Sequence, residues 1–196
     1  MARIEPIPYD ELPSESRSLI DRGMASGMYT NPIPLQIVAY SSAALKAMDA
    51  QYRELFRSGV LEPRLVELVR LHSADINSCT PCSQSRKEAS VTEDDVACLV
   101  DLDRGQFTER EYRALRYFEL LAADHDAIDD ETFRWLAEVF TVAEIVELGF
   151  VCSQNLGGHR FMHTLGVLAQ SEPVLRYRPD AIDAGCGVPS GAPDGQ

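Results

Sequence analysis

Two cysteines separated by two residues, Cys79 and Cys82, are the side chains of this sequence with the clearest chemical potential. A Cys-x-x-Cys pair can alternate between a dithiol and a disulfide, and a nearby cation increases its reactivity by stabilising the thiolate. Glu67 lies twelve residues before Cys79, and Arg86 lies four residues after Cys82. Such a set of residues predicts a redox site, provided that the chain folds back between the carboxylate and the cysteines.

The local sequence predicts this fold-back. Residues 65–71 present an apolar helical face, and residues 75–78 are of types that favour caps and turns. Thr80-Pro81 suits the first turn of a new helix, because the N–H that proline lacks would have no partner there. We therefore expect one helix to end near Asn77 and a second helix to begin at the cysteines.

An antiparallel arrangement of these two helices brings the polar residues together. On a straight helix Glu67 would lie roughly 18 Å from Cys79, whereas a turn centred near residues 76 and 77 places Glu67 opposite Arg86. Cys82 and Arg86 are also an i, i+4 pair, which shares one helix face. The guanidinium and the helix N-terminus would both favour the Cys82 thiolate.

The order Glu67, eleven residues, Cys79-x-x-Cys82 and a basic position four residues later resembles the signature of the carboxymuconolactone decarboxylase superfamily. More narrowly, it resembles the AhpD-like alkylhydroperoxidase branch. The resemblance covers roughly residues 35–168, and EIVELGFVCSQNLGGHRFMHTLGV is similar to the last long helix of that family. It implies that Cys82 attacks the peroxide, that Cys79 resolves the oxidised Cys82, and that Glu67 relays a proton. It also implies that the enzyme needs no bound cofactor.

The sequence departs from this family at Arg86, where the family has a histidine that completes the proton relay. Arginine keeps its proton at ordinary pH, so Arg86 can stabilise a thiolate or pair with Glu67 but cannot shuttle protons. His72, one turn beyond Glu67, is a candidate for the missing base. The alternative for His72 is a purely structural histidine.

The remaining histidines and cysteines have simpler interpretations. His159 and His163 are spaced i, i+4, which can bind a metal, but packing is the favoured role and no metal site is predicted. Cys98 and Cys152 lie in apolar segments and are expected to be buried, inert thiols. Cys186 lies in a segment rich in glycine and proline, where an incidental exposed thiol is expected.

Composition limits the class of protein. The 196 residues are 45% hydrophobic and 25% charged, which is typical of a globular protein. The net charge of −13 argues against binding to nucleic acid or to anionic membranes. The sequence lacks an apolar run of membrane-spanning length and the pattern of a signal peptide, so a cytoplasmic protein is expected, with cysteines that serve as free, catalytic or metal-binding thiols.

The chain is expected to form one all-α domain of about seven or eight helices. We predict an extended N-terminal arm over residues 1–13, an AhpD-like helical domain over 14–178, and a loose tail over 179–196. The domain begins with a short helix near 14–23 and continues, after a loop, with a single helix over 35–56. Capping-box pairs mark three later helix starts, at Thr92 and Asp95, Thr108 and Glu111, and Thr141 and Glu144.

Three functions are compatible with the sequence. The favoured one is a thiol-dependent peroxidase or disulfide reductase that acts on a small hydroperoxide and is recycled by a dithiol donor. The second is a non-redox decarboxylase or isomerase-like enzyme in which Arg86 binds a substrate carboxylate in bidentate fashion. The third is a catalytically silent scaffold or binding protein. The family resemblance also implies a homo-oligomer, as a trimer or hexamer.

Overall fold

A computed structural model of the chain describes residues 2–102, 105–167 and 175–176. These residues form the predicted all-α fold, with one parallel pair of two-residue strands in which Ser85 is paired with Leu175. Some of the helices are only five to seven residues long. In chain order the elements are η1 (Tyr9–Glu11), α1 (Ser14–Ser26), α2 (Pro32–Val38), α3 (Ser42–Arg57), α4 (Pro63–Ile76), α5 (Thr80–Gln84), β1 (Ser85–Arg86), α6 (Glu93–Cys98), α7 (Glu109–Ala123), η2 (His125–Ala127), α8 (Asp130–Ala137), α9 (Val142–Thr164) and β2 (Leu175–Arg176).

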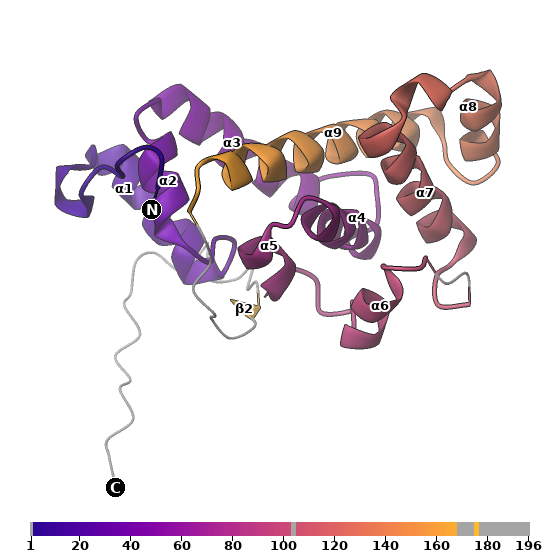
Figure 1. The fold of residues 1–196 in the computed structure, drawn as a ribbon, viewed down its shortest axis with the longest axis horizontal. Helices are drawn as coiled ribbons and strands as arrows, with labels where there is room; N and C mark the ends of the chain where they lie inside the picture. Colours follow the sequence, from indigo (N-terminus) through magenta and orange to yellow (C-terminus); the bar gives the residue numbers. More distant parts are fainter. Residues whose placement is uncertain (1, 103–104, 168–174, 177–196) are drawn as a thin grey trace, which may run out of the picture.

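Helix α4 is the centre of the fold. Figure 1 shows the long helix α9 crossing α4, with α1–α3 at one end of the molecule and α7 and α8 at the other. Residues 65–74 of α4 are all buried, so this helix is enclosed on every side. A polar side chain on such a helix cannot reach bulk water and needs a partner within the protein. Helix α4 buries four polar residues, and each therefore needs a partner within the protein: Glu67, Arg70, His72 and Ser73.

The apolar core has two parts. The larger part joins α4 to α7 and α9 and includes Phe118 and Leu148, whose side chains are fully buried. Burying a side chain of this size contributes about 1.5–3 kcal/mol. The smaller part joins α1, α2 and α3 and includes Leu35 and Leu45, with Met162 of α9 packed against it. The cysteine turn after α4 lies beside this smaller part.

The three helix starts that were predicted from capping-box pairs are present, and each is fixed by side-chain hydrogen bonds to the backbone. Capping boxes are present at Thr92, Thr108 and Thr141, where each hydroxyl accepts the N–H of the residue three positions later and that residue's carboxylate accepts in return. Asp129 begins α8 with a comparable box. An N-cap of this kind is typically worth about 1 kcal/mol.

The first third of the chain differs from the expectation. Helix α1 extends to Ser26, and the single helix predicted over 35–56 is split into α2 and α3. The split has a local cause, because the Ser41 hydroxyl accepts the Ala44 N–H and so caps a new helix. Asn31 caps α2 in the same way, by accepting the Ile33 N–H ahead of a first-turn proline.

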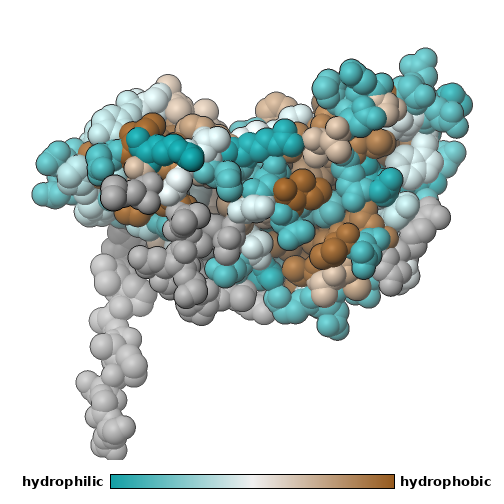
Figure 2. Space-filling view, in the orientation of Figure 1, coloured by the Kyte–Doolittle hydropathy of each residue, from teal (hydrophilic) through white to brown (hydrophobic). Residues whose placement is uncertain are grey.

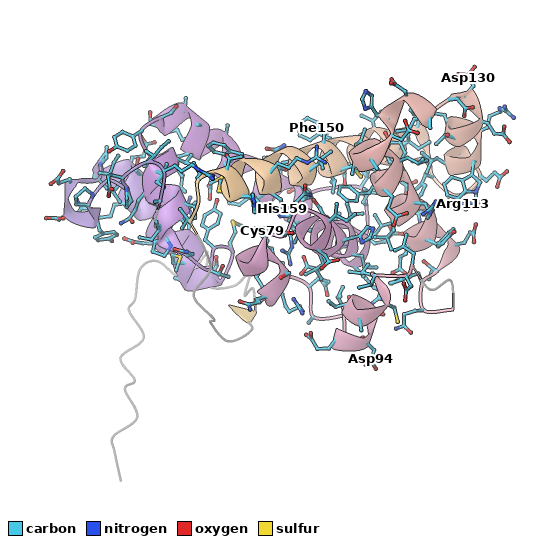
Figure 3. The ribbon with its side chains drawn as sticks, viewed as in Figure 1. Cys79, Asp94, Arg113, Asp130, Phe150 and His159 are labelled. Carbon is cyan, nitrogen blue, oxygen red and sulfur yellow. A yellow bond between two sulfur atoms is a disulfide. The ribbon has the colours of Figure 1, made fainter. Side chains whose placement is uncertain are left out.

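Two surface features complete the fold. The arm packs on the helices, since Leu12 is buried and the Arg3 N–H donates to the Leu165 carbonyl at 2.9 Å. The outward side of α9 carries exposed apolar side chains, among which Phe150 is seen on the outside of the helix in Figure 3. Elsewhere on the face drawn in Figure 2, apolar patches are scattered among hydrophilic residues. Across the described ranges, no helix combines the length and apolar character that crossing a bilayer requires. The predicted tail, with Cys186, lies outside the described residues.

Candidate active site

The turn between α4 and α5 forms where the sequence predicts it. Helix α4 ends at Ile76 with Asn77 as its C-cap, and the Asn77 side chain donates to the Ser73 carbonyl at 2.8 Å. Ser78 has a φ of 52°, a left-handed conformation that reverses the chain in a short space. The Cys79 N–H then donates to the Ala74 carbonyl at 2.8 Å, which fixes the first cysteine against the last turn of α4.

Cys79 and Cys82 form a disulfide, with their Cα atoms 5.3 Å apart. Cys79 is buried, whereas Cys82 is half-buried. Cys98 and Cys152 are free thiols. Burial raises the pKa of the Cys152 thiol far above its ordinary value, so Cys152 remains protonated.

A cavity of about 130 Å³ lies beside the disulfide. Its walls are mainly apolar, and they come from the α1–α2 segment, α3, the end of α9, α4 and the segment from the cysteine turn to Lys87. Both cysteines line it. The residues that line it are Met28, Tyr29, Thr30, Asn31, Pro34, Leu35, Met48, Tyr52, Arg70, Ser78, Cys79, Cys82, Ser85, Lys87, Met162, His163 and Val167.

Glu67 is fully buried beneath this cavity and is held by two residues. Its two carboxylate oxygens accept from Arg70 Nε and Nη2, each at 2.7 Å, in a bidentate ion pair. The backbone N–H of Lys87 also donates to Glu67 Oε1, at 2.8 Å. Both carboxylate oxygens of Glu67 are therefore engaged, in hydrogen bonds of which two are charge-assisted.

Arg70 connects that ion pair to the cysteine turn. Its Nη1 donates to the Cys82 carbonyl at 2.7 Å, and its Nη2 donates to the Ser85 carbonyl at 2.8 Å. The side chain is 1% exposed but still lines the cavity. Arg70 therefore places a fixed positive charge behind the disulfide.

The predicted pairing of Glu67 with Arg86 is wrong. Arg86 is buried and its guanidinium pairs with Glu93 of α6, with N···O distances of 2.7 and 3.0 Å. It also donates to the carbonyls of Ser83 and Ser85. The reason is that α5 ends at Gln84 and Arg86 lies in β1, so Arg86 does not share a helix face with Cys82. Its side chain does not line the cavity beside the disulfide.

Lys87 is the cation that the sequence analysis missed. Its Nζ donates to the Met28 carbonyl and lies 6.0 Å from the centroid of the Tyr52 ring. Burial and the nearby charge of Arg70 lower the pKa of Lys87 to about 7, although Glu67 opposes the shift. The signal available in the sequence was its position immediately after the basic residue of the motif.

His72, the candidate relay base, faces away from the disulfide cavity. It is buried on α4, with Nε2 at 3.3 Å from Glu119 Oε1 and its ring edge-on to Phe118. Burial lowers the pKa of His72, in spite of Glu119, so the neutral imidazole is favoured. This position matches the structural alternative for His72.

The two histidines of α9 point in different directions. His159 is buried with Nδ1 at 2.9 Å from Ser73 Oγ, whereas His163 is exposed and lines the cavity. Burial lowers the pKa of His159 to about 3. In Figure 3 Cys79 lies at the start of α5 and His159 lies on α9. Cys79 contacts Ala74 of α4, and His159 contacts the adjacent Ser73. Among the described side chains, no group of three or more His, Cys, Asp or Glu is placed to hold a metal ion.

Comparison with known proteins identifies the fold through solved structures. No protein-family model and no curated protein matches the sequence. An uncharacterized peroxidase-related protein from Silicibacter sp. TM1040 has a TM-score of 0.70 at 17% identity, over 88% of this chain and 94% of that one. An uncharacterized peroxidase-related protein from Ralstonia eutropha JMP134, described as an alkylhydroperoxidase AhpD core, has a TM-score of 0.72 at 16% identity, over 87% and 93%. The debrominase Bmp8 has a TM-score of 0.72 at 14% identity, over 92% and 96%.

The predicted AhpD-like fold is thus confirmed. The similarity extends over most of this chain and nearly all of each neighbour. One neighbour is a debrominase and two are peroxidase-related, so this fold serves more than one reaction. Activity has to be argued from the site.

Proposed function

We propose that this protein is a dithiol-dependent peroxidase or disulfide reductase that acts on a small hydroperoxide through Cys79 and Cys82. The observation that carries the proposal is the position of the disulfide, which lines a mainly apolar cavity together with the positive charge of Arg70 and the amino group of Lys87. Cations near a cysteine lower its pKa and increase the thiolate population. The half-buried Cys82 is assigned as the nucleophile and the buried Cys79 as the resolving thiol.

The cavity suggests the size of the substrate. A volume of about 130 Å³ is close to that of an apolar cavity of about 150 Å³ that holds benzene. The methionine, leucine and tyrosine side chains of its walls favour an apolar body. We therefore expect short branched or single-ring alkyl hydroperoxides, such as tert-butyl or cumene hydroperoxide, to react faster than long-chain lipid hydroperoxides.

Cysteine substitutions test this function directly. The reduced protein should consume one equivalent of cumene hydroperoxide, and mass mapping should then show the Cys79–Cys82 bond. Cys82→Ser should abolish peroxide consumption, whereas Cys79→Ser should allow one turnover and then stall with an oxidised Cys82. Cys98→Ser is the matched control, because Cys98 is a free thiol that does not line the cavity. Unchanged peroxide consumption in Cys82→Ser would refute the proposal.

The same assays separate the alternatives. A carboxylate-handling enzyme would tolerate both cysteine substitutions, but its proposed anchor, Arg86, pairs with Glu93 and does not line the cavity. A scaffold would show no dependence of any turnover on Cys82. Because a debrominase shares this fold, a small brominated ring should be included as a second oxidant for the reduced cysteines. None of these alternatives has an observation in its favour comparable to the disulfide at the cavity.

A further inference from the structure

Reduction of a hydroperoxide by two thiols requires proton transfers that the family's own relay does not supply here. The oxygen that leaves the peroxide has to be protonated, and the resolving thiol has to lose its proton. Both oxygens of Glu67 are engaged by Arg70 and the Lys87 N–H, and an arginine side chain keeps its protons. His72 lies on the other side of α4, beside Glu119. A different group has to carry the proton.

The walls of the cavity offer few such groups. Among the residues that the structure describes, the titratable side chains that line it, apart from the cysteines and Arg70, are Tyr29, Tyr52, Lys87 and His163. Burial raises the pKa of both tyrosines, so they keep their protons at neutral pH. His163 lies on the exposed rim, at the end of α9. Lys87 is the remaining group.

The structure fixes Lys87 in place from both ends. Its backbone N–H is bound to Glu67, and its Nζ donates to the Met28 carbonyl while lying over the Tyr52 ring. An ammonium group has three N–H donors. One of these N–H groups donates to the Met28 carbonyl. Because Lys87 and both cysteines line the same cavity, another N–H group can reach a substrate there.

We propose that Lys87 is the proton carrier of this dithiol site, an inference that rests on the proposed peroxidase function. As an ammonium it protonates the alkoxide released from the hydroperoxide. As a neutral amine it accepts the proton of the Cys79 thiol. Lys87 would thus take the role that a histidine has in the related family, from the position that follows Arg86.

The steps balance as follows. The Cys82 thiolate attacks the terminal oxygen of the hydroperoxide, the S–O bond forms, the O–O bond breaks, and the alkoxide takes a proton from the Lys87 ammonium to leave as an alcohol. The Lys87 amine then takes the proton of Cys79, whose thiolate attacks Cys82. The S–S bond forms, the S–O bond breaks, and the departing hydroxide receives that proton as water. Two thiols and one hydroperoxide become a disulfide, an alcohol and water, and a dithiol donor reduces the disulfide.

The charged surroundings of Lys87 suit this exchange. Arg70 on α4 faces it with a positive charge and Glu67 with a negative one, while Tyr52 on α3, Tyr29 after α1 and the neutral His159 on α9 enclose it. Burial and the charge of Arg70, opposed by Glu67, bring the pKa of Lys87 to about 7. A general acid or base works best when its pKa lies near the working pH.

Substitution of Lys87 separates proton transfer from charge. Lys87→Arg keeps the positive charge beside the cysteines but cannot exchange a proton at neutral pH. In single-turnover oxidation of the reduced protein by cumene hydroperoxide, both Lys87→Arg and Lys87→Met should be slower by about 10²- to 10⁴-fold. The wild-type rate should show a break near pH 7 that neither variant retains. Full speed in Lys87→Arg would overturn the proposal, because charge alone would then suffice.

Chemical labelling gives a second readout that does not depend on turnover. The chain contains two lysines, Lys46 and Lys87. Acetylation of Lys87, followed by peptide mass spectrometry as a function of pH, should show a midpoint near 7, whereas the exposed Lys46 provides the internal reference. A midpoint for Lys87 equal to that of Lys46 would overturn the assignment even if the variants fail to fold.

His163 is the competing assignment and is tested in parallel. If His163→Gln loses the break near pH 7 while Lys87→Arg keeps it, the carrier is His163 and the inference is wrong. If wild-type protein and Cys82→Ser consume peroxide equally, the proposed function itself fails. If instead peroxide consumption depends on Cys82 but is unaffected by Lys87→Arg, the proposed function stands and only the Lys87 assignment fails.

Discussion

Removing one charge from the buried ion pair between Glu67 and Arg70 should strongly destabilise the protein. The two side chains are 0% and 1% exposed, so removing either charge leaves the other buried without a partner. Breaking a buried pair in this way costs about 3–5 kcal/mol. Glu67→Gln keeps the shape of the side chain and removes only the charge. For a chain of this size, about 2–4 °C of melting temperature per kcal/mol predicts a loss of roughly 6–20 °C.

Urea unfolding followed by circular dichroism measures this effect. The protomer concentration should be kept constant, because association would make the apparent stability depend on it. Lys46→Met is the matched control, since the Lys46–Glu15 pair is exposed by 51% and 69% and should be worth about 1 kcal/mol or less. Combining Glu67→Gln with Arg70→Met removes both charges. The double variant should therefore be about 0.5–3 kcal/mol more stable than the sum of the two single-variant effects implies.

The outcome also distinguishes two roles for Glu67. If Glu67→Gln is as stable as the Lys46→Met control, the pair is not structural and the reasoning from burial is refuted. If the variant is destabilised but the protein that remains folded still forms the Cys79–Cys82 bond with peroxide, Glu67 positions the site and does not relay protons. The Lys87 N–H, which loses a charged acceptor, should then exchange faster with solvent deuterium.

The remaining predictions concern pH and association. Burial lowers the folded-state pKa of His159 to about 3. As the pH falls, His159 is therefore protonated in the unfolded chain, at about pH 6.5, before it is protonated in the folded protein. Stability should therefore fall as the pH drops from about 6.5 towards 3, by roughly 2 kcal/mol at pH 5. His159→Gln should flatten this dependence in urea unfolding, apart from the share that His72 contributes in the same direction. On α9, Val142, Val146 and Phe150 are 79%, 68% and 57% exposed. If this face of α9 forms a contact between copies in the expected homo-oligomer, Val146→Glu should shift sedimentation towards monomer without loss of helicity.

The parts of the structure that follow from neighbouring residues could be predicted from the sequence. The turn after Ile76 and the helix that begins after Cys79 follow from residue types within a few positions of each other. The capping boxes are equally local, because each joins residues three positions apart. The AhpD-like fold is what the resemblance of Glu67, the spaced cysteines and the later long helix to that family's signature implies.

The partners of the charged residues could not be predicted in the same way. Arg86 was assigned to Glu67 on the assumption that α5 continues as a helix, but α5 has five residues and the chain then extends to meet β2. Glu93, the actual partner of Arg86, comes from α6, whose position depends on packing. Arg70 could have been found, because it follows Glu67 at the i, i+3 spacing that allows side-chain pairing.

Under the proposed role of Lys87, the contacts around Glu67 would let a site without the histidine of the resembling family still carry a transferable proton. Arg70 binds both oxygens of the Glu67 carboxylate, and Oε1 also accepts the Lys87 N–H. That hydrogen bond fixes the start of the Lys87 side chain, and the same arginine charge, with burial, lowers the pKa of its amine to about 7. Arg70 thus acts on both the position and the protonation of Lys87. If the proposal is correct, Arg70→Met should therefore raise the pKa of Lys87 in the protein that remains folded, and the acetylation midpoint should move towards that of Lys46.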